Sequence, residues 1–181
     1  MSFYETSWIQ SFLNTPAISR VRRNHGLEHA TLALLSQRYP RQSMAGHSDT
    51  GGFWLMADVP LEAVQSAADE ALERLRAGES NLAVHPNCGT NFATAGVLAG
   101  LAGGLAMLGG GSRMRDKVER LPLAIMGATL ALILAQPLGM RLQEHVTTSG
   151  EPGDLRIVEI SPRQRGGIAG SMKAYRVTTE G

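Results

Sequence analysis

The sequence has one cysteine and almost no net charge, and each shortage excludes a class of protein. Cys88 has no second cysteine to pair with, so the chain forms no intramolecular disulfide. The 17 lysines and arginines are balanced by 16 aspartates and glutamates, which leaves a net charge of +1. That balance gives no electrostatic footprint for nucleic acid, so we expect no nucleic-acid partner. The first residues lack a basic segment followed by an apolar run, so we expect no cleavable signal peptide.

Common catalytic motifs are missing as well. The sequence has no glycine-rich nucleotide loop and no dinucleotide fingerprint. Residues 109–112 end an apolar run rather than follow a strand, so they do not form a serine nucleophile elbow. The sequence therefore names no substrate. A peptide, a lipid-linked amide or no substrate at all stay open.

Charged side chains are absent from two long stretches, residues 92–111 and 121–140. Each is about as long as a helix that crosses a hydrocarbon core of ~30 Å. A helical hairpin buried in a soluble core is the alternative, but soluble helices of this length normally keep a polar face. We therefore predict a transmembrane hairpin over residues 92–140, which makes the lipid bilayer a partner. Pro137 is expected to kink or end the second span.

The orientation of this hairpin in the membrane stays undetermined. The connection at residues 112–120 carries four basic residues, which by the positive-inside rule places it in the cytoplasm. A cysteine that binds metal instead favours placing the polar domain in the reducing cytoplasm. These two arguments conflict, so we predict a multi-pass protein of the bacterial inner membrane without assigning a side to its domain.

Three glycines recur at every fourth residue of the first stretch, Gly96, Gly100 and Gly104, and so share one helix face. Small residues at this spacing let another helix approach closely. That helix is either the second span of the same hairpin or a second copy of the chain. The second alternative predicts a homo-oligomer that forms through these glycines.

Two spans return the chain to the side that it left, so residues 1–91 and 141–181 can form one domain. We expect a small α+β domain of two helices and about four short strands attached to the hairpin. The expected helices cover residues 16–38, begun by the capping hydroxyl of Thr15 and by Pro16, and residues 61–77. The expected strands cover residues 44–47, 52–59, 155–160 and 173–179. An aromatic segment that includes Trp8 and Phe12 either lies at the membrane interface or packs on the domain.

The first long helix carries ionisable residues on an otherwise apolar face. Its predicted inward positions are spaced by three and four residues: Ile18, Val21, His25, Glu28, Leu32, Leu35 and Tyr39. His25 and His29 are four residues apart, so two imidazoles project from one face and can bind one ion, with Glu28 beside them. Buried ionisable groups are costly unless they are paired or bound to metal. A histidine–glutamate hydrogen bond in the core is the simpler alternative.

The segment from His25 to His29 also fits the inverted zincin pattern H-x-x-E-H. In that chemistry the two histidines hold zinc and the glutamate takes a proton from water. With three specified residues the pattern is weak by itself.

A second cluster lies immediately before the first span. His85 and Cys88 can deliver one or two further ligands from a loop. If both bind, the site is closed and structural; if one binds, a position stays open for water. The other histidines are less suited, because His47 is predicted near a strand end and His145 follows the second span.

At these two clusters the sequence resembles the YqhQ-type bacterial membrane proteins, which are predicted metal-dependent enzymes of unknown substrate. Similar segments in that family match residues 25–31, HGLEHAT, and residues 85–90, HPNCGT. The layout is also similar to a smaller uncharacterised bacterial family with a two-span hairpin after the second motif. The chain departs from the larger family at Ala30, where lysine is usual, and in being shorter. The resemblance therefore implies a metal site without implying a reaction.

The sequence thus predicts an integral membrane protein with a zinc site. His25, His29, His85 and Cys88 are the candidate ligands, and Glu28 is the candidate general base of a metal-dependent hydrolase. The alternatives are a non-catalytic scaffold with a structural metal site and an oligomerising membrane protein without metal.

Overall fold

A four-stranded antiparallel sheet and five α-helices form the part of the chain that the computed structural model describes. The described residues are 5–108, 111, 113–163 and 173–181, with the side chains of residues 5–7 left out. The helices are α1 (Glu5–Leu13), α2 (Pro16–Arg38), α3 (Leu61–Arg76), α4 (Gly89–Leu108) and α5 (Met114–Leu142). The strands are β1 (Met44–Asp49), β2 (Gly52–Ala57), β3 (Arg156–Arg163) and β4 (Ala174–Glu180). The predicted α+β class is confirmed.

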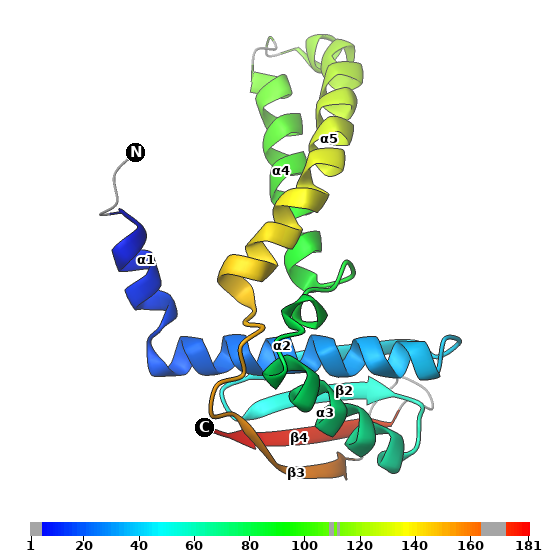
Figure 1. Ribbon diagram of the computed structural model, residues 1–181. Coiled ribbons are helices and arrows are strands. Elements are labelled where there is room, and N and C mark those ends of the chain that lie inside the picture. Colours follow the sequence, from blue (N-terminus) through cyan, green and yellow to red (C-terminus); the bar gives the residue numbers. More distant parts are fainter. Residues whose placement is uncertain (1–4, 109–110, 112, 164–172) are drawn as a thin grey trace. The chain divides into compact units, whose positions relative to one another are not determined.

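The chain separates into two compact units (Figure 1). One comprises Met1–His85 and Glu144–Gly181, and the other comprises Pro86–Gln143. The first unit holds the sheet with α1, α2 and α3, together with a 3-10 turn, η1 (Ser80–Ala83), and a π-helical turn that ends at Thr147. The second unit holds α4 and α5.

The sheet joins segments that the hairpin separates in sequence. Its strand order is β1-β2-β4-β3, so β4 pairs with β2 in the centre and β1 and β3 form the edges. The β1–β2 hairpin turns between Asp49 and Gly52, and the Asp49 side chain accepts the backbone N–H of Gly51 at 2.8 Å. Pro162 lies on edge strand β3, where its missing N–H costs the sheet least.

Helices α2 and α3 cover one face of the sheet, and the core of the unit lies beneath them (Figure 1). Alternate residues of β2 and β4 point into this core, as the period of two of a strand requires. The deeply buried members of the layer include Leu27, Phe53, Leu55, Val64, Ala71, Tyr175 and Val177. On the opposite face, the Arg176 guanidinium lies 5.3 Å from the ring centroid of Trp54.

Helix α2 begins and ends where the sequence predicts, but one detail of its start is different. Pro16 occupies the first turn, where its missing N–H breaks no hydrogen bond. Thr15 was expected to cap the helix through its hydroxyl. The hydroxyl instead donates to the carbonyl of Phe12 at 2.8 Å, because the chain turns there out of α1. The helix α1 itself was not predicted, and its Trp8 and Phe12 side chains are more than half exposed.

The buried face of α2 includes Glu28 and Leu35, as predicted, but it extends to residues beside the predicted line. Leu27, Thr31 and Leu34 are buried, whereas His25 lies at the edge of the buried face and Leu32 is only partly covered. Polar side chains form part of this face. Asn24 is fully buried, donates to the carbonyl of Asp49 at 2.8 Å and accepts the Thr179 hydroxyl at 2.7 Å.

In the second unit, α5 begins earlier than predicted. Residues 112–120 were expected to form the connection between the spans, but α5 starts at Met114. Arg115 donates to Glu119 at 3.0 Å, a pairing four residues apart that suits a helical first turn. The helix also continues through Pro137 to Leu142, so Pro137 does not end it. The last residues of the first predicted span, 109–110, lie outside the described part of the chain.

Both helices of the second unit are long and apolar enough to cross a membrane. Only 6% of the most apolar window of each is buried. The core helix of a soluble protein would bury most of such a surface, so these helices are not core helices. Their exposed side chains include Phe92, Val97, Leu101, Leu105, Ile125, Leu130, Ile133 and Leu134.

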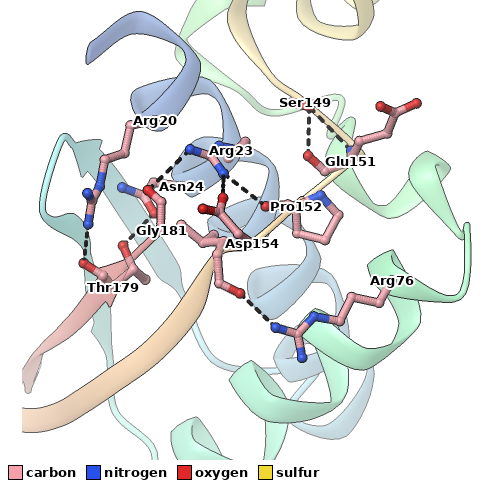
Figure 2. A network of polar contacts seen from close by, with 11 residues as sticks. Arg20, Arg23, Asn24, Arg76, Ser149, Glu151, Pro152, Asp154, Thr179 and Gly181 are labelled. Atoms are coloured by element: carbon pink, nitrogen blue, oxygen red, sulfur yellow. Dashed lines mark hydrogen bonds and ion pairs between the residues drawn. The ribbon is translucent and has the colours of Figure 1, made fainter. Parts of the chain in front are cut away.

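Arginines of α2 and α3 hold the chain that follows the hairpin by its main-chain carbonyls (Figure 2). The bonds are Arg20 to Thr179 (2.7 Å), Arg22 to His145 (3.2 Å) and Thr148 (3.1 Å), Arg23 to Pro152 (3.3 Å) and Gly181 (3.2 Å), and Arg76 to Leu155 (2.8 Å). Figure 2 shows this network except for Arg22. Arg23 also forms an ion pair with Asp154. The segments before and after the hairpin are thereby fixed to each other.

Candidate metal centre

The two histidines of α2 are both oriented by main-chain carbonyls. The Nδ1 atom of His25 lies 2.9 Å from the carbonyl oxygen of Thr147, and that of His29 lies 2.8 Å from the carbonyl oxygen of Ala83. A carbonyl oxygen only accepts, so in both rings Nδ1 carries the hydrogen. In the neutral imidazole the lone pair is then on Nε2, the arrangement in which a histidine binds metal.

Gly26 allows the chain segments that carry these two carbonyls to lie close to α2. A Cβ atom on Gly26 would lie 2.0 Å from the carbonyl oxygen of Ser149 and 3.2 Å from the Cβ of Ala83. Only glycine therefore lets the segment around Thr147 and the turn η1 approach α2 this closely. That approach brings the two carbonyl acceptors to the histidine rings.

Three histidine rings of the first unit, those of His25, His29 and His85, lie near one another. The ring centroids of His25 and His29 are 4.3 Å apart, and those of His29 and His85 are 6.0 Å apart. A metal bound at a ring nitrogen lies about 3.2 Å from the ring centroid, so two rings on one ion have centroids at most about 6.4 Å apart. Both spacings meet this necessary condition.

Glu28 lies on the sheet side of α2 and is 4% exposed. The Ser48 hydroxyl donates to one of its carboxylate oxygens. The other oxygen lies over Gly46, where an added Cβ would be 2.1 Å away. Strand β1 thus positions the carboxylate in two ways. Ser48 donates a hydrogen bond to it, and Gly46 leaves space for it because it has no side chain.

Cys88 belongs to the second unit, directly before the first residue of α4. The backbone N–H of Thr90 points to its sulfur, at an N–S distance of 3.5 Å. A helix N-terminus of this kind favours a thiolate. Three peptide links separate Cys88 from His85, so their Cα atoms are at most about 11 Å apart.

The two remaining histidines, His47 and His145, take no part in the ring contacts described above. His47 alternates along β1 with Gly46 and Ser48, which contact Glu28, so it points to the opposite face and is exposed. The His145 side chain is 69% exposed, and its Nε2 lies 3.8 Å from the carboxylate of Glu144. The lower suitability expected of both from sequence agrees with these positions.

Sequence reasoning missed the groups that hold the candidate residues. The carbonyls of Thr147 and Ala83 are main-chain atoms, which leave no signal in a sequence. Ser48 had no distinguishing spacing either. Gly46 did carry a signal, since glycine inside a strand often marks the close approach of another group.

Comparison with known proteins gives a family and a relative. A family model described as a domain of unknown function (DUF6391) matches residues 20–160. A protein of Picosynechococcus sp. described as uncharacterized is 38% identical over 150 residues, which cover 77% of this chain and 71% of the relative. No solved structure matches the chain. The matched residues include both histidine clusters and both apolar helices.

Proposed function

The chain belongs to the DUF6391 family of domains of unknown function, and on that premise we propose that it is an integral membrane protein with a zinc site built on α2. His25 and His29 are its first two ligands. Cys88 and His85 supply the rest, and His25, His29 and Cys88 together form a donor set that could hold a metal ion.

The observation that carries the proposal is the pair of carbonyl contacts at Nδ1 of His25 and His29. Carbonyl or carboxylate partners of this kind fix the tautomer of metal-binding histidines in proteins. A histidine that serves only as a core hydrogen-bond partner needs no such matched pair. The chemistry of the donor set, imidazole with thiolate, suits zinc.

The membrane part of the proposal is supported by α4 and α5. Their apolar side chains are exposed along both helices, and a hydrocarbon environment would remove that exposure from water. Residues at both ends of the hairpin continue directly into the first unit, so a two-span protein keeps its α+β unit on one side of the bilayer.

A hydrolase is the function that the site would serve if one ligand position is open to water. Zinc bound there supplies Lewis-acid activation of water. Glu28 would accept the proton at its carboxylate, which Ser48 orients and the sheet shields from solvent.

A closed structural site is the second candidate. If both His85 and Cys88 bind, four protein ligands would fasten α2 to the loop before α4 and leave no place for water. The ring spacing of 6.0 Å between His29 and His85 is short enough for both rings to bind one ion, which this candidate requires.

Metal content measured by elemental mass spectrometry on the detergent-purified protein tests the zinc site. We expect near-stoichiometric zinc in the wild type and little in a His25→Ala/His29→Ala variant. The matched control is His145→Ala, which removes an exposed histidine and should leave zinc unchanged. Absence of transition metal from the wild type, after metal-replete expression without chelators, would overturn the proposal.

A Glu28→Gln variant distinguishes the two candidate functions, a hydrolase and a structural metal site. It keeps the size of the side chain and should leave the zinc content intact in both cases. Turnover of a peptide or amide substrate that zinc supports should fall by about 100-fold or more in an enzyme. A structural site shows no zinc-dependent turnover in either protein, and His85→Ala and Cys88→Ser then each lower the zinc content.

A further inference from the structure

A polar pocket of 840 Å³ lies in the first unit. Its volume falls within the range of small-molecule sites in proteins. Helices α1 and α2, the turn η1 and the segment after α5 form its walls. Amide and hydroxyl side chains contribute much of the lining, among them Gln10, Asn14, Ser19, Asn81 and Ser149.

Arg22 contributes a positive charge to this pocket. One of its terminal nitrogens donates to the carbonyls of His145 and Thr148, and its Nε is buried without a hydrogen-bond partner in the described structure. No carboxylate pairs with Arg22 among the residues that the structure describes. Burial lowers the pKa of the guanidinium from its usual value, which shows that the charge is partly withdrawn from water.

The other charges of the lining are compensated or solvated. Arg23 is paired with Asp154, and the Glu144 side chain is 63% exposed. Glu151 is exposed, and its backbone N–H donates to the hydroxyl of Ser149 at 3.3 Å (Figure 2). The uncompensated charge of the pocket is therefore that of Arg22.

We propose that this pocket binds the phosphate group of a small polar ligand, with the Arg22 guanidinium as its main charged contact. A guanidinium presents a planar set of N–H donors that matches the oxygens of phosphate. The amides and hydroxyls around it can serve the remaining oxygens and the polar body of the ligand. The proposal needs no metal and so goes beyond the zinc site.

Two sources would supply this group, a soluble phosphate ester or a phospholipid headgroup. Glu144 and His145 follow α5 by two and three residues, so a headgroup is within reach if α5 spans a bilayer. The three probes are inorganic phosphate, glycerol 3-phosphate and dihexanoyl phosphatidylglycerol below its micelle concentration. They are titrated calorimetrically into the full chain in a phosphate-free detergent solution.

We expect saturable binding of at least one probe, weakened about tenfold or more in Arg22→Gln. The matched control is Arg20→Gln. Arg20 also lies on α2 and donates to a main-chain carbonyl, but it does not line the pocket, so binding should stay within about twofold of the wild type. Binding of the soluble probes identifies a soluble ester, and binding of the lipid alone identifies a headgroup.

Zinc content is measured on the same samples, so that loss of phosphate binding is separated from loss of metal. If Arg22→Gln does not fold, the binding of the same probes to Asn81→Asp tests the proposal instead. It keeps the contacts of Arg22 and adds a negative charge to the lining, which should weaken binding about fivefold. No saturable binding of any probe, equal losses in Arg22→Gln and Arg20→Gln, or unchanged binding in folded Asn81→Asp would overturn the proposal.

Discussion

Single residues of β1 determine where the carboxylate of Glu28 lies. A Cβ atom on Gly46 would meet its Oε1 at 2.1 Å and its Cγ at 2.8 Å. Gly46→Ala should therefore displace the side chain, break the bond from Ser48 and cost about 1–3 kcal/mol in the free energy of unfolding. If Glu28 is the general base, turnover should fall while zinc content stays unchanged.

The thermal midpoint, the zinc content and the turnover of purified Gly46→Ala check this prediction. Ala45→Thr is the control, because it adds atoms to the exposed face of the same strand and should leave all three unchanged. A wild-type midpoint in Gly46→Ala would show that the carboxylate is not confined there.

Asp49 makes the stability of the first unit depend on pH. Its hydrogen bonds with Arg176, at 2.7 and 2.8 Å, are the largest cause that holds its pKa below the usual value. A lowered pKa in the folded state stabilises the protein above the unfolded pKa of about 3.9, and this contribution is lost as the pH falls through the folded pKa.

We therefore expect Asp49→Asn to lower the thermal midpoint at pH 7 and to converge with the wild type as the pH falls below about 3.9. The side chain is 42% exposed, so the effect at pH 7 is no more than about 1 kcal/mol. Glu180→Gln removes a more exposed ion pair and serves as the control. A midpoint difference that stays constant between pH 7 and pH 3 would contradict this account.

Among the helices, α4 presents two sets of glycines with different surroundings. A Cβ on Gly103 would lie 3.9 Å from the carbonyl oxygen of Ala124 on α5, but one on Gly96, Gly100 or Gly104 would meet no atom within 4 Å. The face predicted for close approach is thus not used inside the hairpin, in the part of the chain that the structure describes. A second copy of the chain stays the proposed occupant.

Gly100→Leu should therefore dissociate a homo-oligomer and leave the fold of the hairpin intact. Gly103→Leu should instead disturb the contact between α4 and α5 and lower the thermal midpoint. Native mass spectrometry in detergent, with a midpoint for each variant, separates the two effects. A Gly100→Leu protein with the mass of the wild-type assembly would exclude this face as the interface.

The sequence predicted the elements best where local signals agree. Pro16 and Pro40 bracket α2, and the apolar stripe of α3 matches its buried residues Val64, Ala68 and Leu72. It failed at the first turns of α5, where charge suggested a loop but the Arg115–Glu119 ion pair supports a helix. On α2 it predicted the burial of Glu28 and Leu35 but missed that of Asn24, which is polar and has partners distant in sequence.

The sequence predicted the side chains of the candidate site but not the main-chain groups that orient them. The sequence placed His25, Glu28 and His29 on one helix and identified His85 as part of a second motif. The structure shows the rings of His29 and His85 close to each other. The acceptor of His25 is separated from it by 122 residues, and no local pattern encodes such a contact.

At the scale of the whole molecule, the proposed two-span topology predicts that the connection between α4 and α5 and the first unit are exposed on opposite sides of a bilayer. In a Cys88→Ser background, cysteines introduced at Glu62 and at Glu119 should react with an impermeant maleimide from opposite sides of sealed vesicles. The side that labels Glu62→Cys also resolves the conflict between loop charge and cysteine chemistry. Labelling of both positions from one side would contradict a two-span topology.

The central position of β4 and the carbonyl of Thr147 have a consequence for synthesis on the ribosome. Translation produces α2, β1, β2 and α3 first, then the hairpin, and only afterwards the strand that fills the centre of the sheet. Until then, the inner edge of β2 is unpaired and the His25 ring lacks its acceptor. If the site binds zinc and the hairpin spans the membrane as proposed, the carbonyl that orients His25 is synthesised only after both spans, so the metal would be bound late in synthesis.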